Sequence, residues 1–546
     1  MTLAQQLSGC RRFIGLCSIA AVIIFATTQT SQALGCETPR SSEFLTTSWG
    51  LNERNTRFQV NSRITAGNVK SLELAWVYAL EGGQSPHSYP LVTQDTLYIG
   101  TQEGQLVALD RFNGCTRWRH QAPDSIRTGL VYGQVNNQAV IFFGTGNGEV
   151  EAINALSGKP VWSIDARDHD AQFITGTPVH HNGTLFVPIS SREVGLALSP
   201  LYGCCNSRGA IAAFDAATGK ELWRTHSIAE TPEITGRRWL FIETWGPSGA
   251  PVWSAPTIDT ARNLLLFGSG ENYSAPASAG SDAITALDLT TGERRWSQQY
   301  TAQDKYNMAC EASTDHPNCP EDHGPDLDFG APPILARYDS PNGPQEIILA
   351  GQKSADVHAI DPNSGVRLWS RNIGRGGYLG GVHWGMAANE DLGLLFAPVS
   401  DIRRAYRGST DEPAPGMYAI DIATGEIRWQ SPSEDRCKER EGCNNGYSAA
   451  PIANADLVFL AGLDGWLHAL LGATGEPLWS VDTWRSYEAV NQSDTLTASG
   501  GSIDVHGPLL VEDQLFIQSG YGSFGQKGGN ALLAFRLPDT KEQSNE

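Results

Sequence analysis

Apolar and polar residues follow one another in a fifteen-residue pattern, G-x-L-x-A-L-D-x-x-T-G-x-x-x-W, that recurs along the chain. Its first part alternates apolar and polar positions, which predicts a strand with one buried face. The D-x-x-T-G part is turn chemistry, because Asp and Thr side chains hydrogen-bond nearby backbone and Gly supplies a positive φ. A second strand follows and ends in Trp, so each copy predicts the outer two strands of a small antiparallel sheet. Seven copies are complete: 104–118, 148–162, 209–223, 282–296, 355–369, 415–429 and 465–479.

The spacing of these copies predicts how the sheets assemble. All-β repeats about 45 to 70 residues apart are typical of a β-propeller, in which each repeat is one four-stranded blade. A partial copy at 530–539, without the Trp, raises the expected number of blades to eight. We therefore predict an all-β, eight-bladed propeller over residues 34–540. Its last strand, near 530–535, should pair with a strand from the N-terminal region, because an open propeller would expose strand edges.

The two ends of the chain have a different character. Arg11 and Arg12 precede an apolar run at 13–26 and small polar residues up to Ala33, which is the pattern of a secretory signal peptide over 1–33. The run is too short to span a membrane comfortably, and no other long apolar run follows, so no transmembrane segment is expected in the mature chain. A weak lipobox ending at Cys36 leaves a lipoprotein as an alternative. The polar tail 541–546 is expected to be disordered.

The charge and the cysteine content limit the cellular compartments and the partners that can be expected for this protein. The 546 residues include 59 acidic and 39 basic ones, a formal charge of -20, which argues against nucleic acid and against anionic lipid as partners. Removal of the signal leaves eight cysteines, and an even number in an exported chain favours disulfides and a periplasmic or secreted location. We expect Cys310 to pair with Cys319, Cys437 with Cys443, and Cys36 with Cys115. The remaining two are Cys204 and Cys205, for which we favour a disulfide between neighbours over separate bonds or free thiols. No CxxC zinc pattern and no CxxCH haem site occurs among them.

Several motifs between the repeats resemble one enzyme family. They are PISSREVG (188–195), CCNSRGAIAAFDAATGKELW (204–223), GAPVWSAPTIDTARNLLLFGSGENYS (249–274), GPDLDFGAPP (324–333), GQKSADVHAIDPNSG (351–365), GGVHWGMAA (380–388), GYSAAPIA (446–453) and SGYGSFG (519–525). In this order, over about 45–536, they resemble the pyrroloquinoline quinone (PQQ)-dependent, or quinoprotein, alcohol dehydrogenases. The greatest resemblance is to the polyvinyl alcohol dehydrogenases, without a haem domain. The fold this implies is again the eight-bladed propeller.

The resemblance implies a set of cofactor-binding residues. Trp253 matches the Trp that stacks on the quinone, Arg127 and Thr175 match residues near its carboxylates, and Ser190 matches a quinone-binding Ser. Further expected members of the cofactor site are Cys204, Cys205, Lys353, Trp384 and Asn491. These residue types suit the ligand, because a planar tricarboxylate needs an aromatic face and cationic partners.

The resemblance also implies a calcium site and a catalytic pair. Glu193 and Asp328 match calcium ligands, and a third ligand falls on Glu271 or on its neighbour Asn272. Carboxylate and amide oxygens are the ligands that calcium prefers. Asp328 matches the catalytic base that takes the alcohol proton, and Lys353 the cation beside the quinone oxygens. Gly330 stands where lanthanide-dependent relatives carry an extra Asp, which favours calcium.

The expected function is therefore the exported, PQQ- and calcium-dependent oxidation of a secondary or polymeric alcohol such as polyvinyl alcohol. Hydride would pass to the quinone and electrons to a soluble cytochrome c. Two alternatives remain at this stage: a non-catalytic propeller that serves as a binding or outer-membrane assembly scaffold, and a PQQ enzyme for sugars or other polyols. Similar repeats occur in such scaffolds, so the residues between the repeats must decide.

Overall fold

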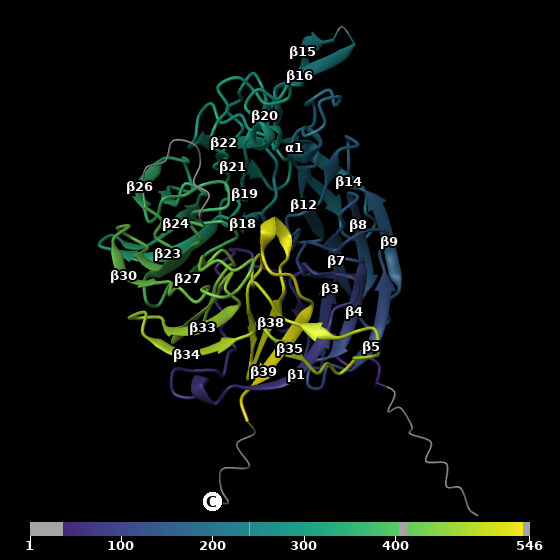
Figure 1. Cartoon of the computed structure of the whole chain (residues 1–546), viewed down its shortest axis with the longest axis vertical. Coiled ribbons are helices and arrows are strands. Elements are labelled where there is room, and N and C mark those ends of the chain that lie inside the picture. Colours follow the sequence, from purple (N-terminus) through teal and green to yellow (C-terminus); the bar gives the residue numbers. More distant parts are fainter. Residues whose placement is uncertain (1–35, 240, 403–411, 539–546) are drawn as a thin grey trace, which may run out of the picture. The chain divides into compact units, whose positions relative to one another are not determined.

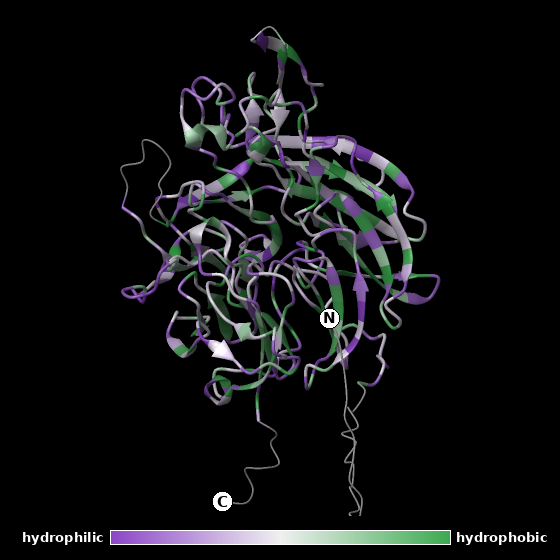
Figure 2. Ribbon diagram, turned by 45° about the vertical axis from the view of Figure 1, so that its right-hand side comes forward, coloured by the Kyte–Doolittle hydropathy of each residue, from purple (hydrophilic) through white to green (hydrophobic). Residues whose placement is uncertain are grey.

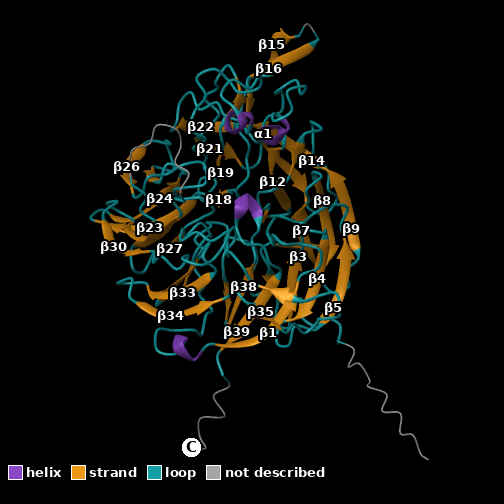
Figure 3. Ribbon diagram, viewed as in Figure 1, coloured by secondary structure: helices purple, strands orange, loops and turns teal. Residues whose placement is uncertain are grey.

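The computed structural model describes residues 36–538 except 240 and 403–411. Within them the chain is almost entirely β-structure and turns (Figure 3). The predicted signal peptide, the lipobox residues before Cys36 and the predicted tail lie outside the described residues. Helical segments in the described part are short: η1 (Val69–Ser71), α1 (Glu193–Leu196), α2 (Ala309–Ala312) and η2 (Ser523–Gly525). None of them has the length and apolar character needed to cross a bilayer.

Eight antiparallel sheets follow one another in the described residues, as predicted for an eight-bladed propeller (Figure 1). The first four contain β2 to β5 (Leu91–Val92, Thr96–Gly100, Gln105–Asp110, Thr116–Gln121), β6 to β9 (Val131–Val135, Gln138–Gly144, Glu149–Asn154, Pro160–Asp165), β10 to β14 (Gln172–Phe173, Val179–His181, Thr184–Ser191, Ala210–Asp215, Glu221–His226), and β18, β19, β21 and β22 (Thr257–Asp259, Leu264–Gly268, Ala283–Asp288, Arg294–Gln299).

The other four sheets repeat the same up-and-down order. They contain β23 to β26 (Ile334–Ser340, Gly343–Gly351, Asp356–Ile360, Arg367–Asn372), β27 to β30 (Ala387–Asn389, Leu394–Val399, Gly416–Asp421, Ile427–Pro432), β31 to β34 (Ile452–Ala453, Leu457–Ala461, Trp466–Leu471, Pro477–Asp482), and β37, β38, β39 and β1 (Leu509–Val511, Gln514–Ser519, Ala531–Arg536, Glu73–Ala79). In the last sheet the N-terminal strand β1 pairs antiparallel with β39, which confirms the predicted closure.

Three two-stranded sheets lie outside the blades. They are β15–β16 (Glu233–Arg238, Ile242–Gly246), β17–β20 (Ser248–Gly249, Asn272–Ser274) and β35–β36 (Ser486–Tyr487, Ala498–Ser499). The β15–β16 hairpin stands clear of the blades at the top of Figure 1.

The recurring Trp and Gly of the sequence pattern lock neighbouring blades together. The ring of Trp223 lies against Gly292 in the turn of the next blade, where an added Cβ would overlap it, and its Nε1 donates to the carbonyl of Leu289 at 3.3 Å. Trp118, Trp162, Trp296, Trp369 and Trp429 each make the same pair of contacts with the following blade. The Gly therefore serves twice, because it adopts positive φ in its own turn and leaves room for the preceding Trp.

Buried apolar clusters lie between adjacent blades and fill the interior. One cluster combines Leu91 and Tyr98 of the β2–β5 blade with Ile141, Phe143 and Ile153 of the β6–β9 blade. Apolar bands therefore alternate with polar ones along the strands (Figure 2). The predicted alternation of buried and solvated faces accounts for this packing.

An N-terminal arm, residues 45–63, contacts all eight blades. Its backbone exchanges hydrogen bonds with the first strand of seven of them or the residue after it, at Val92, Tyr132, Ile258, Leu335, Ala388, Ala453 and Glu512. In the remaining blade, Glu53 of the arm pairs with His181 at 2.7 Å. The buried guanidinium of Arg57 donates to the carbonyls of Trp49, Pro451 and His506. The arm therefore joins the first blade to the last.

The disulfides agree with the cysteine predictions. Cys310 is bonded to Cys319, Cys437 to Cys443, and Cys204 to its neighbour Cys205. Cys36 and Cys115 are both in the disulfide form, and their predicted connectivity stays a prediction.

Candidate active site

The up-and-down order of each blade separates two kinds of loop. The D-x-x-T-G turns join the third strand to the fourth at one end of the blade. The loops from the second strand to the third, and from the fourth to the next blade, leave at the opposite end. These longer loops enclose a cavity of about 590 Å³, within the size range of small-molecule sites. Most of the residues expected in the cofactor site line it: Arg127, Thr175, Ser190, Trp253, Glu271, Asp328, Lys353 and Trp384.

Three buried carboxylates surround one lysine in this cavity. They belong to Glu271, Asp326 and Asp328 and are called the carboxylate group below. The Nζ of Lys353 donates to Oδ1 of Asp326 at 2.8 Å and to Oδ2 of Asp328 at 3.1 Å. Ligand oxygens of Glu271, Asp326 and Asp328 all lie within 4.8 Å of one another. The backbone N–H of Glu271 donates to Oδ1 of Asp328 at 3.0 Å. All four residues are buried, with at most 8% of their surface exposed.

Burial and mutual charge set the ionisation of this group. Burial opposes the charge of Lys353, but Asp326 and Asp328 outweigh it and raise the lysine pKa. Burial by itself would raise the pKa of Asp328, because it also opposes the charge of a carboxylate. The charge of Lys353 and hydrogen bonds with Glu271 outweigh burial and lower this pKa. The pKa of Glu271 is raised, first by burial and then by the charges of Asp328 and Asp326. Asp328 is thus the most acidic of these carboxyls and Lys353 stays protonated.

Trp253 forms one aromatic wall of the cavity. Its Nε1 donates to Oδ2 of Asp328 at 2.9 Å, and its ring meets that of Trp384 edge to face, with centroids 5.0 Å apart. The Lys353 ammonium lies 5.4 Å from the Trp253 ring centroid. Gly330 leaves the space that the outer edge of the indole occupies, since an added Cβ would overlap it.

Polar atoms of the cavity lining that are buried without a hydrogen-bond partner include those of Arg127 and Thr175, and Nε1 of Trp384. Neither Nε of Arg127 nor Oγ1 of Thr175 has a hydrogen-bond partner, although both atoms are shielded from solvent. The Arg127 guanidinium lies 5.4 Å from the Trp384 ring centroid. A buried donor without a partner is costly, so both groups mark a place where a polar ligand would supply the missing bonds.

The vicinal disulfide lies behind the cavity wall. Cys204 and Cys205 are buried in a cluster with Tyr273, and Val194 packs against it. Tyr273 and Val194 line the cavity, whereas the two cysteines do not. The pair is therefore placed to hold the wall rather than to form the cavity surface.

Besides the two cysteines, three residues expected in the site do not line the cavity: Glu193, Asn272 and Asn491. The carboxylate of Glu193 accepts hydrogen bonds from Tyr202 Oη, from the amides of Asn206 and Ser207, and from Ser207 Oγ, so its oxygens are already occupied and do not join the carboxylate group. The amide of Asn272 is bonded to Ser278 and Ser281, so Glu271, not Asn272, faces the cavity.

Asn491 is the third. Its side-chain amide accepts from the backbone N–H of Ala79 and donates to the Ala79 carbonyl. Ala79 ends strand β1, the edge strand of the closing blade. Asn491 therefore fastens the ring closure and does not line the cavity.

Asp326 and His383 are cavity residues that the sequence analysis did not single out. Asp326 precedes Asp328 by two residues in GPDLDFG, and two acidic residues so close together were a usable signal for a cation site. His383 lines the cavity beside Trp384, and its Nδ1 lies 2.9 Å from Ser448 Oγ. Burial and the charge of Lys353 lower the His383 pKa to about 3, so its ring is neutral.

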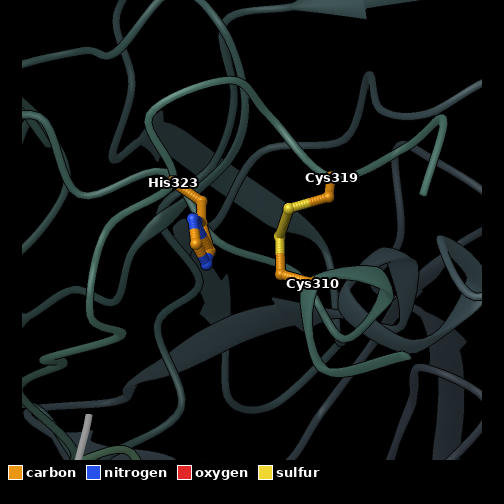
Figure 4. A group of neighbouring side chains, drawn as sticks. All are labelled: Cys310, Cys319 and His323. Carbon is orange, nitrogen blue, oxygen red and sulfur yellow. A yellow bond between two sulfur atoms is a disulfide. The ribbon is translucent and has the colours of Figure 1, made fainter. Parts of the chain in front are cut away.

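A second cluster of metal-ligating residue types has a different character. Cys310, Cys319 and His323 lie close together (Figure 4). The two sulfurs are joined in a disulfide, so they are not thiolates and do not offer a zinc site.

Comparison with known proteins agrees with the motifs. The family model described as "Glucose/ethanol/alcohol dehydrogenase, beta-propeller domain" matches residues 47–316, and that of "Outer membrane protein assembly factor BamB" matches 353–509. The chain is 33% identical over 507 residues to polyvinylalcohol dehydrogenase of Sphingopyxis sp. (strain 113P3), covering 90% of this chain and 76% of that protein. It is 34% identical over 505 residues to polyvinylalcohol dehydrogenase of Pseudomonas sp, with the same coverage.

Among solved structures, the fold is similar to quinohemoprotein alcohol dehydrogenase ADHIIG from Pseudomonas putida HK5. The TM-score is 0.68 at 20% identity, over 91% of this chain and 80% of that one. The likeness supports the same propeller architecture.

Proposed function

Because this chain belongs to the family of PQQ-dependent alcohol dehydrogenases, we propose that it oxidises secondary alcohols, among them the hydroxyl groups of a polymer such as polyvinyl alcohol. The substrate class rests on the two relatives that are 33% and 34% identical and are named polyvinylalcohol dehydrogenases. The scaffold alternative gains no support from the site, because a scaffold does not need a buried lysine among three carboxylates.

The observation that carries the proposal is the pair of unpartnered polar groups of Arg127 and Thr175 in the cavity. The buried Nε of Arg127 and Oγ1 of Thr175 can donate to the carboxylates of PQQ, and the Trp253 ring offers a face for its planar rings. The residues present therefore fit the cofactor. When bound, PQQ supplies the quinone that takes two electrons from the alcohol.

The proposed calcium ligands are Glu271, Asp326 and Asp328. Glu271, Asp326 and Asp328, ionised together beside one protonated Lys353, would carry a net charge of -2, which a divalent cation would balance. Oxygen donors of this kind suit calcium. A bound cation would also hold Glu271 and Asp326 ionised against the effect of burial. Glu193 and Asn272 are not among the proposed ligands, because their side chains are hydrogen-bonded elsewhere.

The residues of the chain divide the remaining work. Asp328 is the proposed base that takes the hydroxyl proton of the alcohol, since its pKa is lowered and the carboxylate is ionised. Lys353 holds Asp326 and Asp328 in place and provides a positive charge beside the quinone oxygens. Trp253 orients Asp328 through the bond from its Nε1.

The electron acceptor and the location are proposed with the same function. We propose export through the signal at 1–33, which the disulfides support because such bonds persist in oxidising compartments. We propose a soluble cytochrome c as acceptor. The formal charge of -20 favours a positively charged protein partner.

Reconstitution tests the proposed function. Purified protein without cofactor is given PQQ and calcium chloride, and dye reduction is followed with primary, secondary, polymeric and sugar alcohols. We expect activity that requires both additions and is greatest with secondary alcohols. Absence of PQQ binding at micromolar concentration with calcium present would refute the enzyme assignment, and a preference for sugars would refute the substrate class.

A matched pair of variants tests the cofactor seat. Thr175→Val removes the unpartnered hydroxyl at nearly constant volume, and Thr231→Val makes the same change at an exposed threonine before β15. We expect the PQQ dissociation constant to rise about tenfold in the first variant, the effect of one lost hydrogen bond to a charged group. Equal dissociation constants in the two variants would contradict the assignment of Thr175.

A further inference from the structure

A second depression adjoins the cofactor cavity on the outer side of helix α1. Its volume is about 520 Å³, and its lining includes Asp170, Ala171, Leu196, Tyr202 and Asn206. We call it the α1 groove. Its residues belong to the two segments that also form the nearby cavity wall, the stretch leading into β10 and the helix α1 with its following loop.

A narrow ridge separates the α1 groove from the cavity. Val194 and Leu196 are two residues apart on α1, so their side chains leave the helix about 200° apart; Val194 lines the cavity and Leu196 the groove. In the neighbouring segment, Phe173 lines the cavity and Ala171 the groove. Two residues of extended chain span about 7 Å. A flexible chain bound in the cavity therefore reaches the groove after crossing a short ridge.

The floor of the groove is fixed to the same wall. Tyr202 Oη donates to the Glu193 carboxylate at 2.8 Å, and the backbone N–H of Asn206 donates to the same carboxylate. Nε2 of His169 lies 2.8 Å from Oδ1 of Asn206. Glu193 is buried and is not part of the carboxylate group of the cavity. Its hydrogen bonds with Tyr202 and Asn206 hold the groove in one shape.

The groove and its rim combine hydroxyl-binding and apolar surface. Asp170 offers an exposed carboxylate and Asn206 an amide. Leu196, Leu198 and Leu201 are 42%, 43% and 68% exposed within six residues of one loop. Exposed apolar side chains gathered in this way mark a binding surface. A carbon chain with a hydroxyl on alternate carbons presents the matching mixture of methylene and hydroxyl groups.

We propose that the α1 groove binds the part of a hydroxylated polymer substrate that extends beyond the reacting unit. This inference rests on the proposed function and names a subsite for it. The cavity of about 590 Å³ must hold both PQQ and the reacting alcohol, so the remainder of a long substrate has to lie outside it. The groove is separated from the cavity only by the ridge at α1 and the start of β10, and it has the required chemistry.

Chain length provides the first test. With the reconstituted enzyme, kcat/KM per hydroxyl is measured for 2-propanol, 2,4-pentanediol, vinyl alcohol oligomers of increasing length and the polymer. We expect a rise of about tenfold once the chain is long enough to cross the ridge, equivalent to about 1.4 kcal/mol of added binding. A value that is independent of length would overturn the proposal, whereas turnover of 2-propanol would still uphold the proposed function.

A matched pair of variants locates the effect. Leu196→Asn changes the groove, and Leu368→Asn makes the same change at a 51%-exposed leucine of β26 on a distant blade. The readout is the ratio of kcat/KM for the polymer to that for 2-propanol. We expect this ratio to fall about five- to tenfold in Leu196→Asn and to stay at the wild-type value in Leu368→Asn.

The outcomes separate the possible failures. A wild-type ratio in Leu196→Asn would overturn the proposal. An equal loss with both substrates would also overturn it, because α1 would then act only by supporting the cavity wall. Calorimetric binding of vinyl alcohol oligomers to protein without PQQ checks the groove independently of turnover. We expect weaker oligomer binding in Leu196→Asn, and equal binding in both variants would count against the groove.

Discussion

Gly330 lies so close to the indole of Trp253 that any side chain at this position would overlap the ring. A Cβ added there would overlap Cη2 and Cζ2 of that ring and would lie 2.6 Å from the backbone carbonyl oxygen of His383. Non-bonded carbon atoms rest about 3.5 to 4.0 Å apart. Since backbone blocks one side, we expect Gly330→Ala to push the Trp253 ring out of its position.

The cost follows from the contacts that Trp253 would lose. Its Nε1 donates to the ionised Asp328 at 2.9 Å, and a hydrogen bond to a charged group contributes about 1.5 to 3 kcal/mol. Its edge-to-face contact with Trp384 contributes about 0.5 to 1.5 kcal/mol more. Restoring the ring to its place on cofactor binding would then cost at least about 2 kcal/mol, which raises the PQQ dissociation constant about 30-fold.

Fluorescence titration with PQQ in the presence of calcium measures this change. Gly67→Ala is the matched control, because Gly67 is exposed and an added Cβ there meets only ordinary contacts. Thermal unfolding followed by circular dichroism confirms that both variants are folded. An unchanged PQQ dissociation constant in folded Gly330→Ala would refute the argument that Trp253 is the cofactor's aromatic platform and that Gly330 makes room for it.

Three further predictions concern the base, the arm and the vicinal disulfide. Asp328→Asn should retain PQQ binding but lose about 10²- to 10⁴-fold in kcat, since the proton acceptor is gone; full turnover in stopped-flow assays would show that another group is the base. Arg57→Met should lower the free energy of unfolding by at least about 3 kcal/mol, because several buried carbonyls lose a charged donor. Arg237→Met, at a 60%-exposed side chain, is the control in thermal unfolding, and equal midpoints would contradict the role of the arm. In denaturant without reductant, Cys204 and Cys205 should resist alkylation, and mass spectrometry that finds either one labelled would exclude the bond.

The parts of the fold that were predictable from sequence are those in which side chains carry the structural signal. The Asp, Thr and Gly of each repeat make the turn, and the Trp packs on the Gly of the next blade, so a pattern of letters corresponds directly to contacts. Thr218 of the third copy shows this: its N–H and Oγ1 both donate to Oδ1 of Asp215 at 2.8 and 2.7 Å. Seven such repeats and one partial copy leave little freedom in the architecture.

The candidate site was less predictable because motifs identify positions but not the direction of side chains. Trp253, Asp328 and Lys353 face the cavity as the resemblance implies. Glu193, equally matched by motif, turns its carboxylate toward Ser207 and Asn206. It begins α1, and a shift of one residue on a helix turns a side chain by 100°. The motif around Asn491 is short and lies in a loop. Its sequence does not distinguish a residue of the active site from one whose side chain binds the backbone of strand β1.

An N-terminal arm leading into the first blade could be expected from the sequence, but its course across all eight blades could not, for a different physical reason. The first strand of each sheet is an edge strand, and its backbone groups need partners from outside the blade. The arm satisfies them with its own backbone, and almost any sequence can offer backbone groups, so no periodicity results. The side chains of Asn55, Arg57 and Gln59 add to these contacts, because they donate to carbonyls of the blades. Arg57 is fully buried and its guanidinium donates to carbonyls of the seventh blade and of the loop that leads into the eighth, but the sequence of the arm does not show which carbonyls these are.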